Sequence, residues 1–110
     1  MDTINAMRSF GALSQRSRLQ AFRLLIKCGE EGMPAGEIAR ELGVPHNTMS
    51  THLSTLVSAG LVKSRRVSRS IIYSADMDGT RQLLTFLVED CCQGRPEDCE
   101  PLLESVMAGC

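Results

Sequence analysis

The stretch that decides the fold is residues 35–58, AGEIARELGVPHNTMSTHLSTLVS. Apolar residues recur at helical spacing in its first part, Ala35–Leu42, and again in its second part, His46–Ser58. Between the two parts, Gly43 stands where a helix closes with a left-handed residue, and Pro45 stands where a new helix opens. The stretch therefore predicts a helix, a tight turn and a second helix.

The second predicted helix has an unusual polar face. Its apolar side consists of Met49, Leu53, Leu56 and Val57. A merely solvated helix would carry lysine and glutamate on the other side, but this one carries short, uncharged hydrogen-bonding side chains. Such side chains bond to base edges and phosphates in the major groove of DNA. The candidate DNA contacts on this helix are His46, Asn47, Thr48, Ser50, Thr51 and His52.

A basic hairpin is predicted directly after this helix. Beyond Gly60, Leu61–Lys63 and Ser70–Tyr73 are apolar or β-branched enough for two short strands, joined by residues 64–69. We expect the arginines of the joining segment to lie along the DNA backbone or in the adjacent minor groove; they are Arg65, Arg66 and Arg69. The alternative is a small helical domain with a solvated basic face, but the order of turn, polar helix, break and basic hairpin favours DNA reading.

Composition and charge agree with a DNA-binding domain. At 110 residues and 43% apolar residues, the chain predicts a single domain, residues 1–110, with a packed core. The net charge of -1 hides a gradient, because residues 40–75 carry five basic and one acidic side chain, whereas residues 76–110 carry two and eight. The basic middle favours an anionic partner, namely double-stranded DNA.

The location of the protein follows from what the sequence lacks. No apolar run approaches the ~20 residues that span a bilayer, and the N-terminus has no signal-peptide pattern. We therefore expect a cytoplasmic protein without a membrane partner. Because cytoplasmic thiols are kept reduced, the five cysteines are interpreted as ligands, sensors or buried apolar residues rather than as a disulfide framework.

Apolar stripes outside the central stretch predict a homodimer. A helical pattern over about residues 80–93 carries Leu83, Leu84, Leu87 and Val88, and a weaker pattern over residues 1–13 carries Ile4, Met7, Phe10 and Leu13. A chain this short needs a second surface to cover both stripes. The alternative is that these side chains fill the core of the monomer. The remaining predicted helices cover residues 17–27 and 102–107.

Three cysteines near the C-terminus predict a metalloid site. Cys91, Cys92 and Cys99 lie within nine residues, and Gly94 and Pro96 allow the chain to bend between them. Three thiols suit a soft three-coordinate centre, arsenic(III) or antimony(III), because arsenous acid condenses with three thiols and releases three waters. Zinc-group cations and redox or persulfide sensing remain as alternatives, as does the possibility that Cys91 and Cys92 simply extend the apolar stripe.

The two outlying cysteines have weaker interpretations. Cys28 is expected to be a small buried residue, and Cys110 to be uninvolved. Neither histidine neighbours a nucleophile, so we expect no enzymatic activity, and no cofactor is required for folding.

The chain resembles the ArsR/SmtB metal-sensing repressors. The resemblance is carried by Pro45–Leu56, by Ala59–Val62, by the wing Ser64–Tyr73 and by Leu13–Leu19. It implies a homodimeric winged helix-turn-helix, mainly α with a small β-hairpin wing (α+β), with dimerisation helices at both ends of the chain. It also implies binding to a palindromic operator until an inducer releases the protein.

Two departures from the family pattern qualify the resemblance. Val67 and Ser68 occupy the wing tip, where these repressors usually have a glycine. Residues 33–39 lack the Cys-Val-Cys box of the best-known arsenic sensors, and the chain is instead similar to a subgroup with a vicinal cysteine pair and a third cysteine. The resemblance implies an arsenic(III)- or antimony(III)-responsive repressor. The alternatives are a redox- or persulfide-responsive repressor, a zinc- or cadmium-type sensor, and a metalloid-binding thiol protein without a DNA role.

Overall fold

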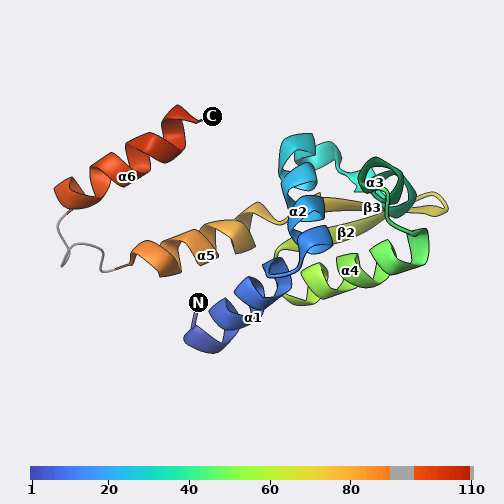
Figure 1. Ribbon diagram of the computed structural model, residues 1–110, viewed down its shortest axis with the longest axis horizontal. Coiled ribbons are helices and arrows are strands. Elements are labelled where there is room, and N and C mark those ends of the chain that lie inside the picture. Colours follow the sequence, from blue (N-terminus) through green and yellow to red (C-terminus); the bar gives the residue numbers. More distant parts are fainter. Residues whose placement is uncertain (90–95, 110) are drawn as a thin grey trace.

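The computed structural model describes residues 1–89 and 96–109. Figure 1 shows helices packed around a small antiparallel sheet, with the chain running from α1 to α6. The elements are α1 (Thr3–Leu13), α2 (Arg16–Cys28), the 3-10 turn η1 (Gly29–Glu31), β1 (Met33–Pro34), α3 (Ala35–Leu42), α4 (His46–Ser58), β2 (Val62–Val67), β3 (Ser70–Ala75), α5 (Met77–Val88) and α6 (Pro96–Ala108). The predicted fold class, a winged helix-turn-helix of mainly α structure, is confirmed.

The helix-turn-helix consists of α3 and α4, with the bounds that the sequence predicts. Gly43 closes α3 in the left-handed conformation, at φ +64°, and its N–H lies against the carbonyls of Ala39 and Arg40. The side of α4 that carries Met49, Leu53 and Leu56 is fully buried. This side packs against α2 and α3, so the opposite side of α4 faces outward.

The wing is longer than predicted. Strands β2 and β3 pair from Val62 opposite Ala75 to Val67 opposite Ser70, so most of the segment expected to be a loop is strand. The turn consists of Ser68 and Arg69, and Ser68 adopts φ +58°. A serine thus takes the left-handed conformation that glycine usually supplies at this position. Arg65 and Arg66 consequently lie on β2, while Arg69 lies in the turn.

A third strand, β1, extends the sheet on the other side of β3. Met33 pairs with Tyr73 and Pro34 with Ile72, which gives the order β1-β3-β2. Gly32, before β1, has φ +67°, and a Cβ at this position would stand 2.2 Å from the carbonyl oxygen of Tyr73. The sequence does not predict this strand, because two residues carry no alternation of apolar and polar side chains.

The N-terminal helix faces the core with its small residues. Ala6, Ser9 and Ala12 are buried, whereas Ile4 and Met7 are 71% and 67% exposed and Phe10 is 39% exposed. Ser9 donates a hydrogen bond from its hydroxyl to the carbonyl of Ala59, at 3.1 Å. The alternative that the larger apolar side chains of α1 fill the monomer core is therefore wrong for these three residues.

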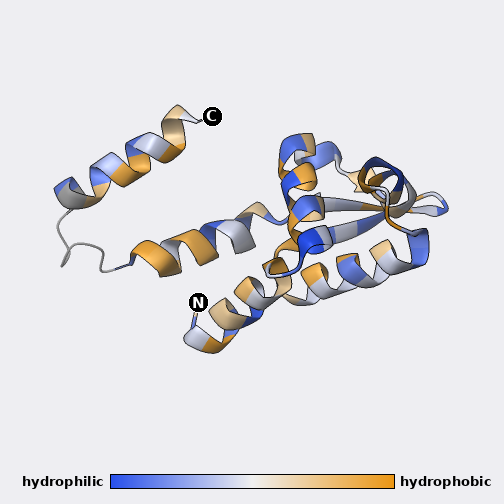
Figure 2. Cartoon of the chain, viewed as in Figure 1, coloured by the Kyte–Doolittle hydropathy of each residue, from blue (hydrophilic) through white to orange (hydrophobic). Residues whose placement is uncertain are grey.

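The C-terminal helices are only partly covered. On α5, Leu83 is buried, contrary to its predicted place on the exposed stripe, but Leu84 and Leu87 are more than half exposed. Pro96 begins α6 rather than merely ending the preceding helix, as is common for proline in a first helical turn. Figure 2 shows apolar residues along both C-terminal helices. Helix α5 leads away from the end that carries α3, α4 and the wing, and α6 turns back toward that end. Among the described residues, no helix has the length and apolar character to cross a membrane.

The start of α5 is fixed by close backbone packing. Asp76 caps the helix, accepting from the N–H of Gly79 at 3.1 Å, and this places the start three residues before the predicted Thr80. A Cβ on Gly79 would lie 1.8 Å from the carbonyl oxygen of Gly60, in the turn that follows α4. Only glycine allows α5 to approach this turn so closely.

We expect Gly79→Ala to lower the free energy of unfolding by about 1–3 kcal/mol, because the added methyl group displaces α5 from the Gly60 turn. The matched control is Gly11→Ala in α1, where a Cβ meets nothing within 4 Å. There the higher helix propensity of alanine should leave stability unchanged or raise it by up to about 1 kcal/mol. Denaturant unfolding at one protein concentration compares the two, and equal stabilities would contradict the proposed packing.

Candidate nucleic-acid interface

The predicted DNA contacts of the second helix gather on the outward side of α4. His46, Asn47, Thr48 and Thr51 are exposed, and Ser50 and His52 are half-buried. Pro45, at the N-cap position of α4, makes no side-chain capping hydrogen bond. All six residues therefore lie on one helix, but four of them are exposed and two, Ser50 and His52, are half-buried.

Hydrogen bonds within α4 limit what some of these side chains offer. The hydroxyl of Thr51 donates to the carbonyl of Asn47 at 3.2 Å, and the amide oxygen of Asn47 accepts from the N–H of Thr48 at 3.0 Å. Thr51 thus presents its methyl group and its oxygen lone pairs, while Asn47 keeps its NH₂ group as a donor. A surface with these groups can accept from, donate to and pack against base edges.

His52 faces a neighbour that the sequence does not identify as part of the site. Its Nδ1 lies 3.4 Å from a terminal nitrogen of Arg18, in the first turn of α2. Arg18 belongs to the stretch Leu13–Leu19 that carries part of the family resemblance. Its contact with a residue 34 positions away could not be derived from local periodicity.

The three wing arginines fall into two groups. Arg65 donates two hydrogen bonds to the η1 carbonyls of Glu30 and Glu31, at 3.0 and 2.9 Å. Successive residues of a strand point to opposite faces, so Arg66 points away from η1. Within residues 1–89 and 96–109, the side chains of Arg66 and Arg69 take part in no hydrogen bond or ion pair. Arg65 therefore anchors the wing, and the charges of Arg66 and Arg69 are available to a ligand.

A cleft lies between the helix-turn-helix and β3. It has a volume of about 400 Å³, and its polar wall comes from α4 and the wing. Most of its lining could not be predicted from the sequence, because α3 and β3 contribute to it from distant parts of the chain. The lining residues are Pro34, Ala35, Gly36, His46, Ser50, Arg69, Ser70, Ile71 and Tyr73. One positive charge beside several hydroxyl groups suits this cleft to an anionic backbone.

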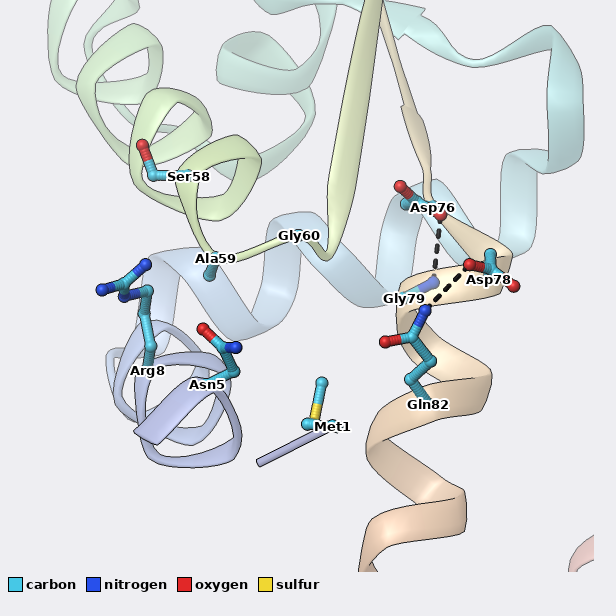
Figure 3. Close-up of a pocket in the computed structure, with 10 residues that line it drawn as sticks. All are labelled: Met1, Asn5, Arg8, Ser58, Ala59, Gly60, Asp76, Asp78, Gly79 and Gln82. Carbon is cyan, nitrogen blue, oxygen red and sulfur yellow. Dashed lines mark hydrogen bonds between the residues drawn. The ribbon is translucent and has the colours of Figure 1, made fainter. Parts of the chain in front are cut away.

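A second cavity, of about 290 Å³, lies where α1, the turn after α4 and the start of α5 meet (Figure 3). Two carboxylates line it, and both serve the first turn of α5. Asp76 accepts from the N–H of Gly79, and Asp78 accepts from Arg81 and Gln82. Both hydrogen bonds lower the pKa of Asp78, and the one from Arg81 has the larger effect. Asp76 is therefore engaged as the N-cap of α5, and Asp78 is engaged by two side chains of the same helix.

The structure describes only part of the predicted cysteine site. Cys91, Cys92 and Cys110 lie outside the described residues, while Cys99, in the first turns of α6, is 8% exposed. Cys99 is disulfide-bonded, which corrects the expectation that the cysteines are all reduced thiols. Cys28 is free and half-buried.

No metal site can be assembled from the described residues alone. Across residues 1–89 and 96–109, no three histidine, cysteine, aspartate or glutamate side chains are grouped closely enough to hold a metal ion. This finding does not test the trio Cys91, Cys92 and Cys99, because two of its members lie outside the described residues.

Comparison with known proteins identifies the class. A model of the helix-turn-helix domain matches residues 13–65, which include α2, α3, α4 and the start of the wing. The nodulation protein NolR of Rhizobium meliloti is 31% identical over 77 residues, which cover 70% of this chain and 63% of that protein. Further relatives at 33% and 35% identity, with 74% and 79% of their lengths covered, are HTH-type transcriptional regulators.

Solved structures extend the similarity beyond the helix-turn-helix to about three quarters of the chain. The winged helix-turn-helix domain of Mb0332 from Mycobacterium bovis, a homodimer described as a possible ArsR-family regulator, is 30% identical. It superimposes with a TM-score of 0.64, and 76% of each chain is covered. A possible transcriptional regulator for arsenical resistance is 27% identical with a TM-score of 0.62, and the match covers 70% of this chain and 77% of the other.

The fold, the exposed polar helix and the wing thus define a DNA-binding transcriptional regulator of the winged helix-turn-helix class. The chain belongs to the ArsR/SmtB family of these regulators. The relatives are regulators rather than enzymes.

We expect Arg65→Gln to loosen the wing, because the substitution removes the fork that binds two adjacent carbonyls. A typical hydrogen bond contributes about 0.5–1.5 kcal/mol, and an exposed one lies toward the lower end of this range. Loss of the two hydrogen bonds should therefore lower the free energy of unfolding by about 1 kcal/mol. Amide hydrogen exchange at Glu31, Gly32 and β2 should become faster. Arg66→Gln is the matched control and should change neither quantity; similar effects of both substitutions would refute the anchoring role.

Proposed function

We propose that the protein is an arsenic(III)- or antimony(III)-responsive repressor, which binds double-stranded operator DNA as a homodimer and leaves it when the metalloid binds. The observation that carries the DNA-binding part is the outward side of α4, which bears uncharged polar side chains and shares a cleft with Arg69 of the wing. Within the described residues, Arg66 and Arg69 are unpaired. Double-stranded DNA presents base edges to the polar side chains and phosphates to the arginines.

In this proposal, α4 enters the major groove. Its 13 residues give a length of about 20 Å, enough to cross the groove with one side while the other side stays buried in the domain. His46, Asn47, Thr48, Ser50, Thr51 and His52 read bases or hold phosphates. The backbone passes the cleft between α4 and β3, where Arg69 supplies the positive charge.

The homodimer is supported by apolar side chains that the single chain leaves uncovered. Ile4 and Met7 on α1, and Leu84 and Leu87 on α5, are each at least 55% exposed. Helices α1 and α5 are in contact, and large apolar side chains exposed on neighbouring helices favour a protein interface. A similar domain, that of Mb0332, is described as homodimeric. A twofold pair would present two α4 helices to successive major grooves of a palindromic operator.

The inducer site is proposed at Cys91, Cys92 and Cys99. Thiolates are soft ligands, and three of them fit a trivalent metalloid that keeps a lone pair. The disulfide of Cys99 must first be reduced to two thiols by a dithiol reductant, which is itself oxidised to a disulfide. Arsenous acid then exchanges three As–O bonds for three As–S bonds and releases three waters. Similarity to a possible regulator for arsenical resistance supports this choice of inducer.

A second candidate trigger is thiol oxidation itself. It is favoured by one specific observation, the disulfide at Cys99. In this version the oxidised and reduced proteins differ in operator affinity, and no metalloid is needed.

The DNA-binding proposal predicts that Arg66→Gln weakens binding to a duplex from the protein's own promoter and makes the salt dependence less steep. Loss of one phosphate contact reduces the slope of log K against log salt concentration by about 0.9. Arg23→Gln, at an exposed arginine of α2 remote from the wing, is the matched control and should change neither affinity nor slope. Fluorescence anisotropy at several salt concentrations measures both, and equal slopes for all three proteins would refute contact by the wing.

The inducer proposal predicts that the reduced protein is released from this duplex by arsenite, and that Cys91→Ser, Cys92→Ser and Cys99→Ser each abolish the release. Their affinity for DNA without arsenite should stay within about twofold of the parent protein, because none of the three cysteines is among the proposed DNA contacts. Cys28→Ser is the control and should respond normally, since the Cys28 thiol is free and lies in α2.

Two outcomes would reject the inducer site. If all three serine variants respond like the parent protein, the trio does not bind the metalloid. If arsenite has no effect but peroxide or a persulfide donor releases the DNA, and mass spectrometry finds a crosslink at Cys99, the trigger is thiol oxidation.

A further inference from the structure

Arg18 connects three helices through one guanidinium group. Its Nε donates to the carbonyl of Ala12 at 2.7 Å, in the last turn of α1, and a terminal nitrogen reaches Nδ1 of His52 at 3.4 Å. Ala12 is buried, and Arg18 and His52 are both half-buried. The group therefore joins the end of α1 to the middle of α4 across the start of α2.

The chemistry of the pair determines the state of the histidine ring. A guanidinium group has donors and no acceptor, so Nδ1 of His52 must accept. A ring that accepts at Nδ1 carries a proton on Nε2. The Nε2–H group is consequently left free to donate a hydrogen bond to DNA, either to a phosphate oxygen or to an acceptor atom of a base.

We propose that Arg18 is a positioning residue for DNA binding: it holds the ring of His52 with Nε2–H as the free donor and ties α4 to the end of α1. This inference rests on the proposed binding of DNA by α4. Lysine could not replace the arginine, because a single ammonium group lacks the rigid planar fork that bridges the Ala12 carbonyl and the ring nitrogen.

A second link between the same two helices supports this role. The buried hydroxyl of Ser9 on α1 donates to the carbonyl of Ala59, directly after α4. Helix α4 is thus attached to α1 near its middle by Arg18 and at its end by Ser9. Of these links, only the one through Arg18 also engages a side chain on the proposed DNA-reading helix.

The first test is a double-mutant cycle of Arg18→Gln and His52→Ala, scored by anisotropy on the promoter duplex at several salt concentrations. Arg18→Gln alone should weaken binding about fivefold, the effect of about one hydrogen bond. In the His52→Ala background it should change affinity less than twofold. The salt slope should stay unchanged, because Arg18 makes no phosphate contact of its own. Arg18→Lys should not restore the affinity.

Two results would overturn the inference. If Arg18→Gln reduces the salt slope by about 0.9 and acts equally with and without His52, Arg18 contacts a phosphate directly. If it weakens DNA binding equally in both backgrounds with an unchanged slope, and lowers stability in parallel, the residue is merely structural.

The second test needs no DNA and separates this inference from the proposed function. Nitrogen-15 NMR of the His52 ring should show an unprotonated Nδ1 and a protonated Nε2 in the parent protein, with both resonances moved toward the free-imidazole tautomer mixture in Arg18→Gln. Identical ring resonances in the two proteins would refute the contact. Normal resonances with no binding of the parent protein to its promoter would instead refute the proposed function.

Discussion

The burial of one side of α4 is the constraint on which the rest of the structure depends. Met49, Leu53 and Leu56 are each fully buried against α2 and α3, and each is about one helical turn from the next. Because the period of the helix is fixed, this buried stripe determines which side chains point outward. The helix therefore cannot rotate about its axis without exposing the centre of the core. The residues on its outer side keep a defined direction as a result.

Much of the fold could be predicted from the sequence, because it depends on local signals. Gly43 and Pro45 mark the turn between α3 and α4, and the bounds of both helices follow from these residues and the apolar period. The wing was less predictable. Ser68 takes a left-handed conformation that its residue type does not announce, and the strands extend almost to the turn because cross-strand pairing, a non-local interaction, favours it. The two-residue β1 depends wholly on its pairing with β3.

The candidate site shows the same division. The outward residues of α4 follow from helical spacing, and the structure brings them together. The contacts of Arg65 with η1 and of Arg18 with His52 join residues more than 30 positions apart, so no periodic pattern reports them. The disulfide of Cys99 was not predicted, because the interpretation of the cysteines relied on the reducing conditions of the cytoplasm.

The separation of charge along the molecule has a consequence for how it meets DNA. The protein is 49 Å long, and the arginine-bearing wing lies at one end, whereas the acidic α6 lies at the other (Figure 1). An object with a positive and a negative pole turns in the field of a polyanion before it touches it. The protein should thus meet DNA with the wing first. Repulsion between the acidic end and the DNA would shorten encounters in the wrong orientation, without strengthening the final complex of protein and DNA.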